Sequence, residues 1–162
     1  MTVHSCPDGR GGAAAVPDEE VWTLHATGTL VAADDDGPSR PAAEVWPPRG
    51  AVPVGVDDLY DRLADMGYEY GPLFQGVRAA WRRGEDVFAE VALPDVPSAD
   101  TKGFGIHPAL LDAVFHMSID PSSDEVRLPF VWSGVELSGP PGAVLRVTLS
   151  PSGEAGVAVA VA

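Results

Sequence analysis

The sequence predicts an α+β fold in which an antiparallel sheet wraps around one central helix. Three observations support this fold class. A short helix near residues 108–116 is apolar over most of its circumference, strand-like segments precede and follow it, and two of these segments form a hairpin pattern. A helix with apolar residues on nearly all sides is normally buried. Antiparallel strands around such a helix are typical of α+β domains.

Composition sets the broad class of protein. The chain has 162 residues, of which 45% are hydrophobic and 21% charged, so it can form one globular core, or one domain plus a piece of another. Its net charge of -14 argues against binding to nucleic acids or anionic membrane surfaces. The single cysteine excludes an internal disulfide and fits a reducing cytoplasm. Histidine spacing does not favour a metal site, and no stretch approaches the roughly 20 apolar residues of a membrane span.

The first third of the chain predicts one strand followed by a linker. Residues 1–20 are rich in Gly, Ala and Pro without periodicity, so we expect a loop there. Residues 21–31 alternate between apolar and polar side chains, which predicts a half-buried strand with Trp22, Leu24 and Leu30 on its apolar face. Residues 32–53 are rich in proline and predict an extended linker.

The remainder predicts a helix and then strands. An apolar stripe at i, i+4 and i+7 indicates a short amphipathic helix over residues 57–66, which Gly67 ends. Residues 77–81 and 87–93 predict two strands joined by a polar turn. Three further strands are expected after the central helix, at about 126–137, 143–150 and 156–162. The last one stops within its alternating pattern, which suggests that the chain is cut there.

The central helix carries a candidate site. Asp112 and His116 lie one helical turn apart, so they point to the same side of the helix. Pro108 suits the first turn, where its missing N–H costs nothing, and this places His107 near the N-cap. A carboxyl group buried in an apolar helix is costly to keep, which makes this pair a site candidate.

Several motifs in combination resemble the dehydratase domain of modular type I polyketide synthases, a double hot-dog fold. The matching segments are YGPLFQG at 70–76, AAWRR at 79–83, VFAEV at 87–91, HPALLDA at 107–113 and LPFVW at 128–132. The resemblance implies that the chain is a truncated, C-terminal part of such a domain. Residues 1–31 would end the first hot-dog, residues 32–53 would be the linker, and residues 54–162 would form the second hot-dog.

The resemblance implies a reaction and its catalytic groups. Such domains remove water from a β-hydroxyacyl chain that an acyl carrier protein holds on its phosphopantetheine, and no other cofactor is implied. A histidine in an H-x-x-x-G-x-x-x-x-P motif takes the α-proton. An aspartate in a D-x-x-x-Q or D-x-x-x-H motif protonates the leaving hydroxyl, and Asp112 and His116 match this second motif. Burial among apolar side chains would favour the protonated acid that such a donor needs, with His116 as a neutral, orienting neighbour.

The resemblance also implies substrate contacts around this pair. Tyr70 is similar to a tyrosine that lines the substrate tunnel. For the neighbouring Phe74, core packing is the expected role. In the LPFVW motif, Pro129 and Phe130 either line the tunnel or pack in the core. His107 is expected to act mainly as a structural cap. The expected substrate-binding residues are Tyr70, Phe74, Gln75, His107, Pro108, Leu111, Pro129 and Phe130.

The second catalytic group is missing from the sequence. No histidine fits the base motif, because the residues four positions later are Asp8, Thr29, Leu111 and Asp120 instead of glycine. We therefore expect the chain alone to be inactive, as a fragment of a longer synthase, with a split enzyme half or a decayed remnant as alternatives.

Other functions and the expected partners complete these hypotheses. A non-catalytic acyl-binding or docking module, and a related product-template or pyran-forming cyclase, stay open as alternatives. The expected partners are an acyl carrier protein and the rest of the synthase module, with a homodimer in the parent synthase.

Overall fold

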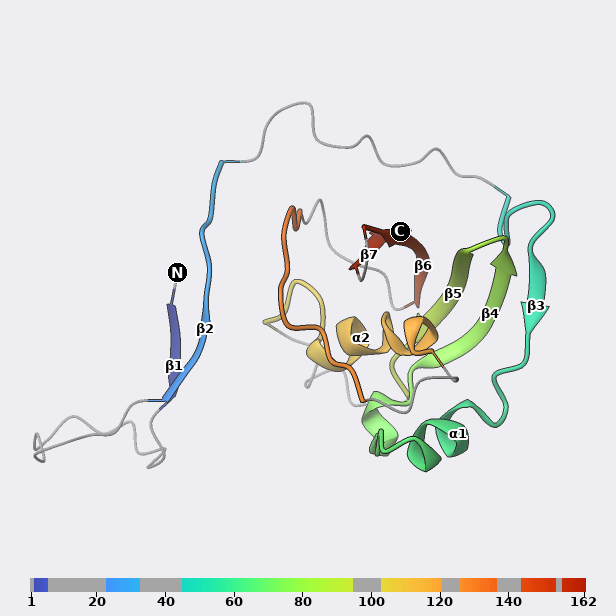
Figure 1. Cartoon of the computed structure of the whole chain (residues 1–162), viewed down its shortest axis with the longest axis horizontal. Coiled ribbons are helices and arrows are strands. Elements are labelled where there is room, and N and C mark those ends of the chain that lie inside the picture. Colours follow the sequence, from blue (N-terminus) through green and yellow to red (C-terminus); the bar gives the residue numbers. More distant parts are fainter. Residues whose placement is uncertain are drawn as a thin grey trace, which may run out of the picture. The chain divides into compact units, whose positions relative to one another are not determined.

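Figure 1 shows the computed structural model of the chain. It describes residues 2–5, 23–32, 45–94, 103–120, 126–136, 144–153 and 156–162. The chain divides into two compact units, Met1–Gly37 and Pro38–Ala162.

The first unit contains two antiparallel strands, β1 (Thr2–Ser5) and β2 (Thr23–Thr27). The expected strand near residues 21–31 is confirmed at its centre, but residues 2–5 also form a strand where a loop was predicted. Local composition missed β1 because its partner lies about 20 residues away in the sequence. The expected half-burial of β2 is not seen, since the side chains of Leu24 and Leu30 are 55% and 77% exposed.

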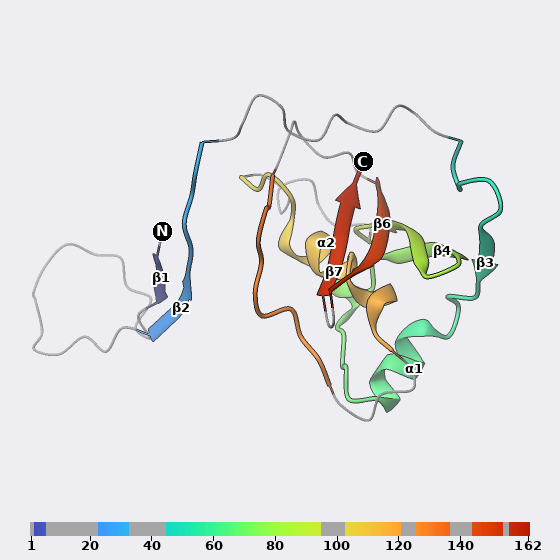
Figure 2. The same cartoon turned by 45° about the horizontal axis from the view of Figure 1, so that its top comes forward.

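The second unit is built on a five-stranded antiparallel sheet with the strand order β3-β4-β5-β6-β7. The strands are β3 (Val52–Val54), β4 (Val77–Arg83), β5 (Asp86–Ala92), β6 (Val144–Ser152) and β7 (Gly156–Val161). Strands β4 and β5 form the predicted hairpin, and Gly84 adopts the positive φ of 61° that its tight turn requires. The sheet curves around helix α2 (Pro108–Ala113), as Figures 1 and 2 show. This confirms the predicted α+β architecture.

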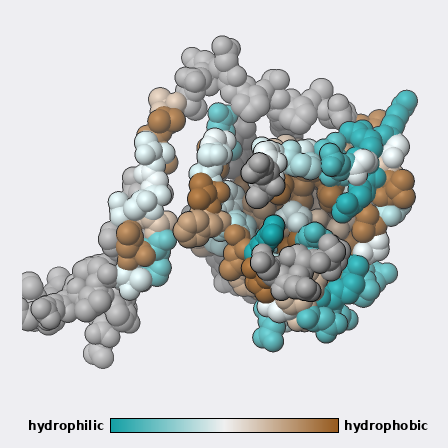
Figure 3. Space-filling model, viewed as in Figure 1, coloured by the Kyte–Doolittle hydropathy of each residue, from teal (hydrophilic) through white to brown (hydrophobic). Residues whose placement is uncertain are grey.

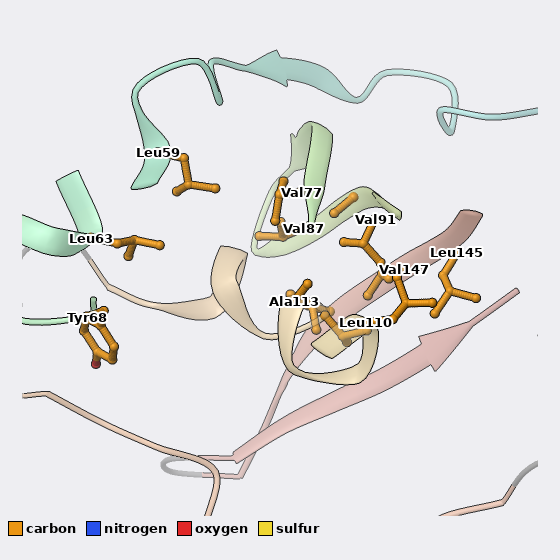
Figure 4. Packing of buried hydrophobic residues seen from close by; sticks show 13 residues of the cluster. Leu59, Leu63, Tyr68, Val77, Val87, Val91, Leu110, Ala113, Leu145 and Val147 are labelled. Carbon is orange, nitrogen blue, oxygen red and sulfur yellow. The ribbon is translucent and has the colours of Figure 1, made fainter. Parts of the chain in front are cut away.

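Helix α2 is buried in the concave face of the sheet. Its side chains Ala109, Leu110 and Ala113 are almost fully inaccessible. Figure 4 shows Leu110 and Ala113 beside Val91 and Val147 of the sheet. The helix is shorter than the predicted span, because a turn follows Ala113 and a short 3-10 helix, η2 (His116–Ser118), comes next. Packing on several strands holds in place a helix that is too short to be stable alone.

Helix α1 (Leu59–Asp65) closes one end of this core. It buries Leu59 and Leu63, as the apolar stripe predicted, and Gly67 ends it with a φ of 94°. A short 3-10 helix, η1 (Pro72–Phe74), follows and packs against α2. Figure 3 shows hydrophilic side chains over α1, which matches its amphipathic pattern.

The opposite face of the sheet carries an aromatic cluster that includes part of the predicted linker. The Trp46 ring meets the rings of Trp81 and Phe88 edge-on, with centroids 6.1 Å and 6.0 Å apart. The guanidinium of Arg146 lies 5.6 Å from the Trp46 ring. Residues 33–44 lie outside the described residues, but residues 45–54 belong to the second unit, and Val52–Val54 form β3 of its sheet. The predicted linker therefore extends too far toward the C-terminus. Its proline content gives no sign that Trp46 packs on the folded unit.

A strand was expected at about residues 126–137, and this prediction is wrong for the described part, residues 126–136. The segment runs as an extended chain beside α2 (Figure 1). Pro129 lacks an N–H for a ladder hydrogen bond, and Gly134 has a positive φ of 60°, so a regular strand is interrupted. The Tyr68 hydroxyl instead forms hydrogen bonds with the backbone N–H and C=O of Arg127. The ring centroids of Trp132 and Phe115 are 5.0 Å apart. Figure 3 shows apolar side chains along this segment.

Within the part of the chain that the structure describes, no helix is long and apolar enough to cross a membrane.

Gly76, between η1 and β4, lies close to β5 and α2, and this contact predicts a stability effect. A Cβ there would lie 2.9 Å from the Ala113 Cβ and 3.2 Å from the Ala92 carbonyl oxygen. We expect Gly76→Ala to lower the free energy of unfolding by about 1–3 kcal/mol through overpacking. Urea unfolding followed by circular dichroism measures the change. Gly55→Ala is the matched control, because nothing lies within 4 Å of a Cβ at that position. Equal stability of the two variants would contradict the predicted close packing.

Candidate functional site

Asp112 and His116 form a hydrogen-bonded pair at the end of α2. The His116 Nε2 lies 3.1 Å from the Asp112 Oδ2, as their spacing of four residues predicts. The exposure of Asp112 differs from what the sequence suggested. The His116 side chain is 1% exposed, whereas that of Asp112 is 41% exposed. The expectation of a buried Asp112 is therefore wrong, because α2 turns its Ala109–Leu110–Ala113 side into the core and leaves the Asp112 carboxyl at the edge.

Both ring nitrogens of His116 have a partner. Its Nδ1 lies 3.2 Å from the hydroxyl of Tyr60, which comes from helix α1. That hydroxyl in turn accepts a hydrogen bond of 2.9 Å from the backbone N–H of Val77, at the start of β4. Burial lowers the pKa of His116 and outweighs the opposite effect of Asp112, so the imidazole is neutral near pH 7. This neutral state agrees with the role expected for His116.

Tyr70 covers the face of the His116 ring. The two ring centroids are 4.0 Å apart with a tilt of 38°, and the Tyr70 ring stacks on Tyr68 at 6.3 Å. Burial and the nearby Asp112 carboxylate raise the pKa of Tyr70 to about 12, so it is a neutral phenol at physiological pH. The structure thus brings Tyr70 into the Asp112–His116 site.

The residues that follow Tyr70 support its backbone. The Gln75 side-chain amide donates a hydrogen bond of 2.9 Å to the Tyr70 carbonyl oxygen. This contact satisfies the Gln75 amide within the protein, as in a structural residue. Phe74 lies in η1, against α2, and its side chain is 38% exposed.

The start of α2 shows the predicted cap. The Nδ1 of His107 accepts a hydrogen bond of 3.2 Å from the backbone N–H of Ala109, and Pro108 occupies the first turn. His107 also meets the Phe104 ring edge-on. Leu111 is half-buried and Pro108 is exposed. The capping geometry explains the HP pair at the head of the helix without a substrate contact.

Pro129 and Phe130 lie on the extended segment 126–136 and do not pack into this core. Pro129 is exposed, and the Phe130 side chain is 94% exposed. Several apolar neighbours on the segment are exposed as well, so among the described residues of the second unit they do not form the wall of an enclosed tunnel. Those neighbours are Val126, Leu128, Val131 and Val135.

An open hollow of about 630 Å³ lies next to the pair. Tyr60 and Tyr70 link the two features, because both line the hollow and both contact His116. The other lining residues lie just before α1, on α1 and in the segment after it: Asp57, Asp61, Ala64, Glu69, Gly71 and Gln75. In the described segments, no three His, Cys, Asp or Glu side chains gather into a metal-binding group.

Tyr60 is the site residue that the sequence analysis missed. Its neighbour Leu59 belongs to the apolar stripe of α1, and Tyr60 flanks that stripe. A tyrosine beside a buried stripe signals a hydroxyl that needs a partner. The sequence does not reveal that this partner is 56 residues away.

Comparison with known proteins identifies the family. Residues 38–159 match the family model described as polyketide synthase dehydratase N-terminal domain. The chain is 46% identical over 162 residues to the polyketide synthase GfsB of Streptomyces halstedii, covering 95% of this chain and 3% of that protein. It is 48% identical over 146 residues to the mycoketide-CoA synthase of Mycobacterium tuberculosis, covering 87% and 3% of the two chains. The chain thus spans only a small part of the curated relatives it matches.

Solved structures agree in fold. One, from work on dehydratase substrate selection for the borrelidin and fluvirucin polyketide synthases, superposes with a TM-score of 0.81 at 42% identity. The erythromycin dehydratase gives a TM-score of 0.80 at 41% identity. The match covers 99% of this chain in both cases, and 54% and 55% of the two solved chains. These neighbours confirm the expected hot-dog fold.

One expectation stays open after this comparison. The matched family model is described as an N-terminal domain, whereas the motifs suggested the C-terminal half of a dehydratase, so the choice of half is a proposal and not a finding. The family itself is shown by the model match over most of the chain and by the agreement of fold: the chain belongs to the polyketide synthase dehydratase family.

Proposed function

We propose that this chain supplies the proton-donating half of a dehydratase site, with Asp112 as the acid. The substrate is a β-hydroxyacyl chain on an acyl carrier protein. A base takes the α-proton, and the electrons of that C–H bond form the Cα=Cβ double bond. The Cβ–O bond breaks, and the hydroxyl leaves as water with the proton from Asp112. The product is the α,β-unsaturated thioester.

The observation that carries this proposal is the asymmetric environment of the Asp112 carboxyl group. Its Oδ2 is 3.1 Å from the buried Nε2 of His116, while the side chain is 41% exposed. The hydrogen bond fixes one oxygen and thereby orients the whole planar group. The exposed part of the carboxyl group can therefore approach a substrate hydroxyl in a defined direction, which a general acid requires.

The neutral state of His116 suits this role. A charged imidazolium would favour the carboxylate form of Asp112 and oppose its action as a proton donor. Burial lowers the pKa of His116, which avoids that charge near pH 7. Tyr70 is likewise a neutral phenol beside the pair, with its pKa raised to about 12, so it can donate a hydrogen bond to a thioester oxygen without ionising.

The base is proposed to come from outside this chain. None of the four histidines fits H-x-x-x-G-x-x-x-x-P, and the chain matches about half of each dehydratase domain structure compared above. The D-x-x-x-H motif on the central helix supports assignment of residues 54–162 to the second, C-terminal hot-dog. Residues 1–31 would then end the first hot-dog, which carries the base. The family match does not favour a purely acyl-binding module or a cyclase.

The setting follows from the relatives, which are modular polyketide synthases. We infer that an acyl carrier protein presents the substrate, that the parent synthase is a cytoplasmic homodimer, and that Tyr70, Phe74 and Leu111 lie along the acyl chain. Pro129 and Phe130 would join them when the rest of the domain covers the exposed segment 126–136.

Removal of the acid is the direct test of the proposal. In the complete dehydratase domain that contains this chain, we expect Asp112→Asn to lower the rate of dehydration roughly 10²- to 10⁴-fold, the usual contribution of a general acid. Mass spectrometry of the acyl thioester measures the loss of water. Asp65→Asn, at the exposed end of α1, is the matched control and should leave the rate unchanged. Unchanged turnover in Asp112→Asn would refute the assignment.

The absent base gives a second prediction. The purified 162-residue chain should not dehydrate a β-hydroxyacyl thioester, because it has an acid and no base. Mass spectrometry of the acyl thioester measures water loss by the chain alone and by the complete domain, so that the two rates can be compared. Measurable turnover by the chain alone would show that it contains its own base.

The buried neutral imidazole predicts a pH dependence of stability. The pKa of His116 is lowered from 6.5 in the folded state, so below about pH 6.5 the unfolded state binds more protons and folding stability falls as the pH decreases. The variant His116→Gln lacks this titration. We therefore expect the difference in unfolding free energy between the wild-type protein and His116→Gln to shrink from about pH 7.5 to about pH 5.5. Urea unfolding at several pH values measures it, and a constant difference would argue against a neutral, buried His116.

A further inference from the structure

We propose that Tyr60 is a positioning residue that donates its hydroxyl proton to Nδ1 of His116 and thereby supports the tautomer in which the imidazole proton sits on Nε2 and points at Asp112. The orientation of the Asp112 carboxyl would then be set from the backbone of strand β4, through one hydroxyl and one imidazole. The catalytic meaning of this arrangement rests on the proposed function, whereas the tautomer itself does not.

The first step is the anchoring of the Tyr60 hydroxyl. Its oxygen accepts a hydrogen bond of 2.9 Å from the Val77 N–H. A backbone N–H can only donate, so this contact uses a lone pair of the oxygen and leaves the hydroxyl proton free to point elsewhere. Burial raises the pKa of Tyr60, so the phenol keeps that proton at physiological pH.

The second step concerns the two nitrogens of His116. The Tyr60 oxygen lies 3.2 Å from Nδ1, and the Asp112 Oδ2 lies 3.1 Å from Nε2. A neutral imidazole carries one proton, so one nitrogen donates and the other accepts. When Nδ1 accepts from the Tyr60 O–H, Nε2–H donates to Asp112 and both contacts are satisfied.

The alternative tautomer satisfies these contacts less well. With the proton on Nδ1, the Tyr60 oxygen would accept from both Nδ1–H and the Val77 N–H. The Nε2 lone pair would then face Oδ2, and only a proton on that same oxygen could make a hydrogen bond. That proton would point at His116 and away from the substrate. The Tyr60 contact therefore favours the tautomer that leaves the other oxygen of Asp112 to act as the acid.

The neighbouring aromatic ring provides the comparison. Tyr70 also contacts His116, but it lies across the ring face, with centroids 4.0 Å apart. Removing the Tyr70 hydroxyl is the same chemical change as in Tyr60→Phe. It should not alter which nitrogen is protonated.

The test is ¹⁵N NMR of histidine side chains in the complete dehydratase domain that contains this chain, near pH 7.5. The spectrum of His116→Gln assigns the His116 signals. In the wild-type protein we expect a protonated Nε2 and an unprotonated Nδ1 whose shift shows an accepted hydrogen bond. In Tyr60→Phe the Nδ1 signal should move toward that of an unbonded nitrogen. Tyr70→Phe should leave the protonated nitrogen unchanged.

Kinetics adds a readout that a merely structural residue would not produce. Tyr60→Phe should lower kcat roughly tenfold, about the effect of one lost hydrogen bond, with KM unchanged. The proposal would be overturned if KM changed by the same factor as kcat, or if the Nδ1 signal of Tyr60→Phe stayed unchanged.

A wild-type spectrum with the proton on Nδ1 would overturn the proposal even if Tyr60→Phe fails to fold. This result is also independent of the proposed function. If Asp112→Asn keeps full activity while the tautomer is as expected, the proposed function fails and the positioning role of Tyr60 stands.

Discussion

The burial of helix α2 in the sheet is the constraint on which the rest of the structure depends. The helix has six residues, too few for stability in water, so its position is set by packing against β5 and β6. Because Ala109, Leu110 and Ala113 must face the core, the Asp112 side chain lies partly exposed at the margin of the core, and His116 is buried next to it. The exposure of Asp112 and the burial of His116 are both consequences of this one packing arrangement.

A buried imidazole in this core needs partners for both nitrogens, since an unpaired polar group there would be costly. Asp112 and Tyr60 supply them, and the Val77 N–H holds the Tyr60 hydroxyl. Helix α2, helix α1 and strand β4 therefore each contribute a polar group to one hydrogen-bonded cluster around His116, which lies among apolar side chains. The same contacts that satisfy His116 also link α1 and β4 to the end of α2, so local stability and site geometry are coupled.

The sequence predicted the elements whose signals are local. The apolar stripe of α1, the hairpin of β4 and β5, the His107 cap and the i, i+4 pair of Asp112 and His116 depend on neighbours within a few residues. The missed features depend on distant partners. Strand β1 pairs across a long connection, Trp46 packs on Trp81, and Tyr60 bonds a histidine 56 residues away. The apolar pattern of residues 126–136 looked like a strand, but Pro129 and Gly134 prevent the ladder.

The openness of the site bears on how the proposed acid would work. A proton donor is most effective where water is excluded, yet Asp112 is 41% exposed and the hollow beside Tyr60 and Tyr70 is open. The apolar side chains of segment 126–136, with Phe130 94% exposed, lie on the same folded unit and have little to pack against within it. A second half that covered this segment would bury apolar surface and close the site in one step. The proposed base and the missing shielding from water would then come from the same place.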